Sequence, residues 1–248
     1  MHALLLVAVG VWCFLTALAG GLVGLVLGNI RLPVIVFAAA GPAAGAGANI
    51  GVSAIAAATA SLAHVRAGRV DWRLVAWMAP PSVLGAIGGS ALSAALPGDV
   101  LLIVIGGALL VFGLDLLRPR GGSALEPGRE SLSAAVVAGA AIGFLGGVVG
   151  LILGSLRMPA LLRFVGAEPA RAIGTNLLVG VFVGLAGVAA HAPTGVDWTL
   201  FAIGGGASVP GALLGARLTG RLAERRLLQT VGAILLVAGT AAILQGLL

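Results

Sequence analysis

The sequence predicts an all-α polytopic membrane protein made of two homologous halves. Sixty percent of its 248 residues are hydrophobic and 9% are charged, whereas roughly a quarter are charged in an ordinary soluble domain. Apolar runs fill nearly the whole chain, and they are long enough for the roughly 20 residues with which a helix crosses a bilayer. They lack the alternation of a spanning β-barrel. We therefore expect membrane helices and no separate soluble domain.

The first half contains five apolar runs, at about 3–28, 32–41, 45–64, 72–96 and 99–117. No positive residue precedes the first run, so we expect a helix of the mature protein there and not a cleaved signal peptide. The second run is short and overlaps Pro33, which lacks a backbone donor and disfavours helical geometry at Leu32. The other three runs are long enough to be helices of membrane length.

The second half repeats the first at an offset of about 126 residues. The segment GGLVGLVLGNIRLP at 20–33 returns as GGVVGLILGSLRMP at 146–159, with nine of fourteen positions identical. The segment LLIVIGGALLVFG at 101–113 likewise matches LLQTVGAILLVAG at 227–239. We therefore predict one transmembrane domain over 1–248, with about five helical segments in each half: repeat 1 at about 1–117, a polar linker at 118–130 and repeat 2 at about 131–248.

Arginines indicate that the two halves are inverted relative to each other. Three of them cluster around the loop at 65–71, yet the matching loop HAPTGVD at 191–197 has none. In the second half, arginines cluster at 217–226, where the matching loop of the first half has none. Positive residues mark the cytoplasmic side, so equivalent loops should lie on opposite sides. This requires an odd number of crossings per half, which is five when the short run after the glycine motif counts as a crossing or half-crossing. Whether that run crosses completely stays open, so the number of complete crossings is eight to ten.

The repeated glycine motif predicts a broken helix in each half. Gly24 with Pro33, and Gly150 with Pro159, are the residues expected to interrupt the helices,. Transporters with inverted repeats build substrate sites near the midplane from such interrupted helices. The alternative is that the glycines only let helices pack closely. Packing alone does not explain why a charged residue recurs beside each glycine run.

Arg31 and Arg157 are the recurring charges, and two interpretations remain open for them. They could hold an oxyanion together with helix N-termini and free backbone amides. They could instead extend from helix ends to the lipid headgroups. Their recurrence favours the binding site, because charge inside a membrane is costly and usually functional.

Further polar residues recur near the arginines and complete the candidate site. Their side chains or backbone could bind an anion, although Asn, Ser and Thr also cap helices. The additional candidates are Asn29, Ser155, Asn49, Thr175, Asn176, Gly28 and Gly154. His64 and His191 end the third run of each half and could couple transport to protons, or they could simply lie at the membrane interface.

Other functional classes find no support in the sequence. All eight acidic residues fall at run ends or in loops, so no carboxylate sits deep in a long run as an obvious sodium or proton carrier. The sequence lacks a nucleophile elbow, a phosphate-binding loop and a metal-ligand cluster, and Cys13 is its single cysteine. We therefore expect no enzyme activity, no metal and no cofactor. The net charge of +6 fits the positive-inside tendency, and no nucleic-acid partner is expected.

Several motifs together resemble the sulfite exporter TauE/SafE family of bacterial and archaeal permeases. They are the glycine-rich first helix leading into a proline, the GTN at 174–176 with GAN at 47–49, the loops ending in Val-Asp-Trp, and PGALLGARL at 210–218. The resemblance covers both halves. It implies cofactor-free transport of small sulfur-containing anions, such as sulfite, sulfonates or sulfoacetate, across the cytoplasmic membrane. Many members have a third glycine near 29–31 and 155–157, where this chain carries its arginines.

The residues and the resemblance together favour a secondary anion transporter that works by alternating access in the cytoplasmic (inner) membrane of a prokaryote. Its partners would be a small anionic substrate and the lipid bilayer, and a homo-oligomer is an open alternative to a monomer. An anion channel and a non-transporting membrane scaffold are the competing functions. Interrupted, inverted helices favour the transporter over the channel. A scaffold would not need polar residues repeated at the breaks.

Overall fold

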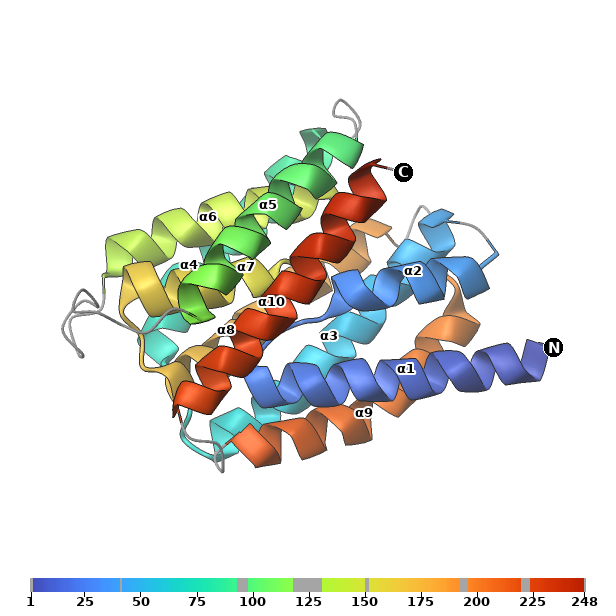
Figure 1. The fold of residues 1–248 in the computed structure, drawn as a ribbon, viewed down its shortest axis with the longest axis horizontal. Helices are drawn as coiled ribbons and strands as arrows, with labels where there is room; N and C mark the ends of the chain where they lie inside the picture. The colour runs from blue at the N-terminus through green and yellow to red at the C-terminus, as the bar shows by residue number, and fades with distance from the viewer. Residues whose placement is uncertain are drawn as a thin grey trace.

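The protein is helical throughout the residues that the computed structural model describes, which are 2–40, 42–92, 98–117, 131–149, 152–191, 196–219 and 224–247. In chain order, the helices are α1 (His2–Val23), α2 (Gly28–Ala38), α3 (Pro42–Arg66), α4 (Trp72–Leu92), α5 (Gly98–Leu117), α6 (Leu132–Val149), α7 (Gly154–Ala160) with the π-helical turn η2 (Leu161–Val165), α8 (Pro169–His191), α9 (Trp198–Thr219) and α10 (Glu224–Leu247) (Figure 1). The predicted all-α class, with five segments in each half and a short one after the glycine motif, is confirmed.

Four of the described helices are long and apolar enough to cross a membrane. They are Ala3–Val23 in α1, Gly47–Arg66 in α3, Pro169–Ala189 in α8 and Trp198–Thr219 in α9. Large apolar side chains cover the outside, as shown by Leu4, Phe37 and Leu84, which are 79%, 83% and 70% exposed. Such a surface is stable against lipid and not against water. The fold is that of a multi-pass membrane protein.

The helix break of the first half lies at Gly24, one of the two residues expected to interrupt the helix, and not at Pro33. Gly24 has a φ of +72°, and the N–H of Leu25 donates to the carbonyl of Gly20 over 2.9 Å. A glycine in the left-handed conformation just past the last turn is a common helix terminator, so α1 ends at Val23. The chain is irregular over 24–27 and α2 begins at Gly28. The expectation that Pro33 keeps Leu32 out of a helix was wrong, because both residues lie inside α2.

The second break follows the same plan. Helix α7 begins at Gly154 and contains Pro159, and η2 then continues it to Val165. Gly166, with a φ of +80°, ends that turn. The irregular backbone described before α7 comprises residues 152–153, while Gly150 lies outside the described residues, as does the predicted linker at 118–130.

The repeated Asp-Trp pair marks where two equivalent helices begin. The carboxylate of Asp71 accepts the N–H of Leu74 over 2.9 Å, and that of Asp197 accepts the N–H of Leu200 over 3.0 Å. An aspartate in this position satisfies one of the free N–H groups of the first helical turn. The repeat of this motif therefore has a structural explanation.

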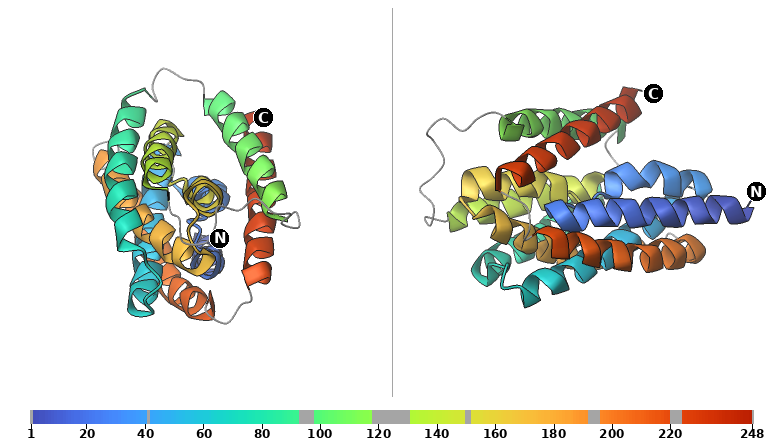
Figure 2. Two further views of the ribbon diagram at one scale, coloured as in Figure 1. Left: turned by 90° about the vertical axis from the view of Figure 1, so that its left-hand side faces the viewer. Right: turned by 60° about the horizontal axis from the view of Figure 1, so that its bottom comes forward.

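Helices of the two halves interlock. Helix α1 of the first half packs along α9 of the second, and α4 packs along α6 in the equivalent way. Helices α5 and α10 pack mainly against each other and form one layer at the side of the molecule (Figure 2, left). Glycines allow these contacts: a methyl group on Gly21 of α1 would lie 2.5 Å from the carbonyl oxygen of Ala212 on α9.

Equivalent helices run antiparallel where they meet. On α5 and α10, Gly106 faces Gly239 and Gly113 faces Gly232, with a methyl group on any of the four falling 2.7 to 3.0 Å from the carbonyl oxygen of its partner. Helices α3 and α8 cross in the same sense, because Ala54 faces Gly184 while the later Ala57 faces the earlier Gly180. An inverted repeat requires antiparallel equivalents. Which side of the membrane each loop faces stays a prediction.

Candidate functional site

The two helix breaks lie side by side in the interior. A methyl group on Gly154, at the start of α7, would come within 3.2 Å of the backbone nitrogen of Val26 in the first break. The side-chain amide of Asn176 on α8 joins them, since its Nδ2 donates to the carbonyl of Gly24 and, over 3.0 Å, to that of Gly154. Non-helical backbone is tolerated inside a membrane protein where protein groups satisfy it, and Asn176 does so here.

Arg31 projects from α2 onto α3. Its Nε donates to Oδ1 of Asn49 over 3.0 Å, and its Nη2 donates to the carbonyl of Asn49 over 3.4 Å and to the hydroxyl of Ser53. The Nδ2 of Asn49 in turn donates to the carbonyl of Gly28 over 3.0 Å. The first turn of α2, the arginine and the asparagine thus form one hydrogen-bonded unit.

Arg157 forms the equivalent unit in the second half. Its Nη1 donates to Oδ1 of Asn176 over 3.3 Å, and Asn176 donates to the carbonyl of Gly154, the counterpart of Gly28. The Nε of Arg157 is buried and has no hydrogen-bond partner. Position 180, one helical turn after Asn176, is a glycine, so the hydroxyl that Ser53 offers Arg31 has no counterpart here.

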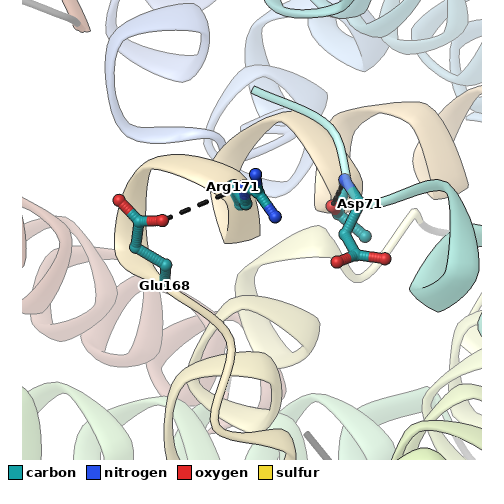
Figure 3. Close-up of polar contacts among 4 residues, drawn as sticks. Asp71, Glu168 and Arg171 are labelled. Atoms are coloured by element: carbon teal, nitrogen blue, oxygen red, sulfur yellow. Dashed lines mark hydrogen bonds and ion pairs between the residues drawn. The ribbon is translucent and has the colours of Figure 1, made fainter. Parts of the chain in front are cut away.

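Both guanidinium groups are buried in the interior. Arg31 is 1% exposed and Arg157 is 0% exposed, which contradicts the alternative that they reach the lipid headgroups. Among the described residues, no carboxylate forms an ion pair with either arginine. One ion pair among the described residues, from Arg171 Nε to Glu168 Oε2 at 3.9 Å, lies on the surface where α8 begins (Figure 3). A buried charge is costly unless it is paired, so an anion would complete this site.

A small cavity adjoins the first unit. Its volume is about 10 Å³, and its wall includes Arg31, Thr16, Gly20, Gly21 and the backbone turn at 25–27. That volume is room for about one water molecule, so the cavity beside Arg31 is too small for an oxyanion. A polyatomic anion can occupy this cavity only if the residues that line it move apart.

The other predicted site residues differ in where the structure places them. Asn49, Asn176, Gly28 and Gly154 contact the arginines or hold the helices that carry them. Ser155 is buried in the first turn of α7, and the side chains of Asn29, Pro33 and His191 are outside what the structure describes. Thr175 is placed differently from the expectation: its hydroxyl accepts the backbone N–H of Asp71 over 3.0 Å and so fixes the loop between α3 and α4, beside the start of α8 (Figure 3).

The sequence interpretation missed Ser53 and left the role of His64 undefined. Ser53 follows Asn49 by four residues, which places both side chains on the same face of a helix, so helical spacing could have found it. His64 is fully buried at the end of α3, with its Nε2 3.4 Å from the carbonyl oxygen of Gly21. It lies against a residue of the cavity wall and not at an exposed interface.

Comparisons with known proteins agree with this architecture. The family model described as sulfite exporter TauE/SafE matches residues 9–242. Two proteins of Xylella fastidiosa, each described as "Probable membrane transporter protein", are 31% identical (strain Temecula1 / ATCC 700964) and 32% identical (strain 9a5c). Each match covers 76% of this chain and 76% of the relative. No solved structure matches the chain. The match over nearly the whole length shows that the chain belongs to the sulfite exporter TauE/SafE family and is a multi-pass membrane transporter.

Proposed function

We propose that the protein is a secondary transporter of small oxyanions, with sulfite, sulfonates and related organosulfur anions as its substrate class, in the cytoplasmic membrane of a prokaryote. The observation that carries the proposal is the pair of arginines, 1% and 0% exposed, whose described partners are neutral amides, carbonyls and a hydroxyl. Each guanidinium offers a fixed positive charge and several donors, which suit the oxygens of one anion.

The surroundings of the arginines support alternating access. Each arginine is tied to an asparagine that also holds the start of the helix carrying it. An anion that competes with Asn49 or Asn176 for these donors would therefore loosen the contact between α2 and α3 or between α7 and α8. The cavity of about 10 Å³ beside Arg31 is too small for a polyatomic anion in this conformation. Substrate binding and helix movement are thereby coupled.

The test is flux of radiolabelled sulfite into vesicles that contain the purified full chain, with methanesulfonate and chloride as competitors. We expect saturable uptake that methanesulfonate inhibits more strongly than chloride, and we expect Arg157→Gln to abolish it. The measurement is made with and without a pH gradient, which reveals proton-linked coupling. Flux that never saturates would identify a channel. The absence of any oxyanion flux from folded protein would leave the scaffold alternative.

A further inference from the structure

A second pair of basic side chains with buried nitrogen atoms, His64 and Arg69, lies at the end of α3 and in the loop after it. His64 is 0% exposed, and its Nδ1 has no hydrogen-bond partner. Arg69, five residues later in the loop before α4, donates from Nη2 to the carbonyl of Ala216 over 3.0 Å. Its Nε and Nη1 are buried and have no hydrogen-bond partner in the part of the chain that the structure describes. Native proteins rarely leave buried polar atoms unsatisfied, and each such atom calls for a water, an ion or a functional explanation.

The groups packed around these atoms offer no negative charge among the described residues. Helix α1 contributes the carbonyl of Gly21, and α9 contributes the carbonyl of Ala216 together with the hydroxyl of Thr219, which donates to Gly21 over 3.2 Å. The carboxylate of Asp71, close by in the chain, accepts the N–H of Leu74 and caps α4. Burial accordingly lowers the pKa of Arg69, because desolvation penalises its charged form,.

This group adjoins the candidate site through one shared residue. Gly21, whose carbonyl faces His64, also lines the cavity that reaches Arg31. The cavity therefore has Arg31 in its wall and, on the other side of Gly21, His64, which is followed in the chain by the loop with Arg69. The matching segment of the second half, at 191–197, contains no arginine, so Arg69 has no counterpart there.

We propose that His64 and Arg69 form a second oxyanion-binding position, at the end of α3 and in the loop between α3 and α4. Its place on the transport path rests on the function proposed above; its capacity to bind an oxyanion does not. The free N–H groups of Arg69 donate to anion oxygens. Because Nε2 of His64 faces a carbonyl, Nδ1 of the neutral ring is an acceptor. Nδ1 can therefore accept the O–H of a singly protonated oxyanion such as hydrogen sulfite.

A direct test uses selenite, a sulfite analogue that anomalous scattering can locate, in crystals of the full chain. We expect a selenium peak within hydrogen-bond distance of Arg69 and His64. The peak should vanish in Arg69→Gln and persist in Arg73→Gln, the matched control, because Arg73 is an exposed arginine four residues away. A peak at Arg31 and Arg157 without one at Arg69 overturns the second position. A peak at Arg69 alone supports the second position and overturns binding at Arg31 and Arg157. If no peak lies at either place, both binding proposals are overturned.

Sulfite exchange in vesicles tests the role on the path. We expect Arg69→Gln to raise KM about tenfold, as expected for the loss of a hydrogen bond to a charged group, with Vmax and Tm close to wild type. If Arg69 only caps the end of α9, the substitution will lower Tm and Vmax and leave KM unchanged. Vesicles of phosphatidylcholine are compared with vesicles that also contain phosphatidylglycerol. A KM shift that needs the anionic lipid would assign the position to a headgroup phosphate and overturn its place on the path.

Discussion

Replacing Arg31 or Arg157 by alanine should weaken oxyanion binding strongly, because both side chains are desolvated. Removing one partner of a buried, hydrogen-bonded charge contact costs about 2–5 kcal/mol. At 1.4 kcal/mol for each factor of ten, this is roughly a 30-fold to few-thousand-fold loss of affinity. An exposed ion pair would contribute only about 0–1 kcal/mol. The larger value applies here because Arg31 is 1% exposed and Arg157 is 0% exposed. Lysine should restore only part of the affinity, since it supplies charge without the planar fork of donors.

The assay is calorimetric titration of sulfite into purified protein whose folding is checked by its thermal transition. Arg171→Ala is the matched control, because this arginine is exposed and its ion pair with Glu168 lies on the surface. It should bind sulfite as the wild type does. Near-native affinity in both Arg31→Ala and Arg157→Ala would refute the binding role. A loss of affinity that lysine repairs completely would show that only charge matters, not the hydrogen bonds seen here.

Three further predictions follow from the fold. Single cysteines placed at 65–71 and at 192–196, in a Cys13→Ala chain, should react with an impermeant reagent from opposite membrane sides; reaction from one side would mean parallel halves. Gly215→Ala should lower the Tm in detergent, because its methyl group would overlap the carbonyl oxygen of Leu18, whereas Gly206→Ala on the same helix meets nothing within 4 Å and should be neutral or stabilising. An alanine held in the left-handed conformation costs about 1–2 kcal/mol. Gly24→Ala should destabilise the protein by more than this, because its methyl group would also lie 2.7 Å from Cα of Ile173. Gly68→Ala, also left-handed but with nothing within 4 Å, should cost only that amount, and equal losses in chemical denaturation would contradict the packing argument.

Patterns within one helix or one repeat were reliable guides to local structure. Continuous apolar runs identified the helices, because the bilayer requires about 20 such residues for each crossing. The repeated Asp-Trp pairs proved to be helix starts, a property that depends only on residues three positions apart. Recurrence of arginine and asparagine in both halves singled out Arg31 with Asn49 and Arg157 with Asn176, and each of these pairs is hydrogen-bonded.

The position of the first break shows why local patterns were insufficient there. Gly24 and Pro33 were both expected to interrupt the helix, and each can do so. The chain ends α1 at Gly24, where a side chain would collide with Ile173 of the second half. Proline is instead accommodated inside α2. The choice depended on what packs against the glycine, and that residue is 149 positions away in the chain.

The amino-acid order alone determined the membrane class, the internal repeat and the choice of Arg31 and Arg157. Hydropathy, periodicity and recurrence are properties of the chain itself. The hydrogen-bond partners that decide what the other polar residues do follow only from how the helices stack. Thr175 and Asn176 are neighbours in sequence, yet one holds the loop at Asp71 and the other holds Arg157 and the carbonyl of Gly24. Successive side chains on a helix point about 100° apart, so adjacent residues meet different elements, and only the packing of distant segments determines which ones.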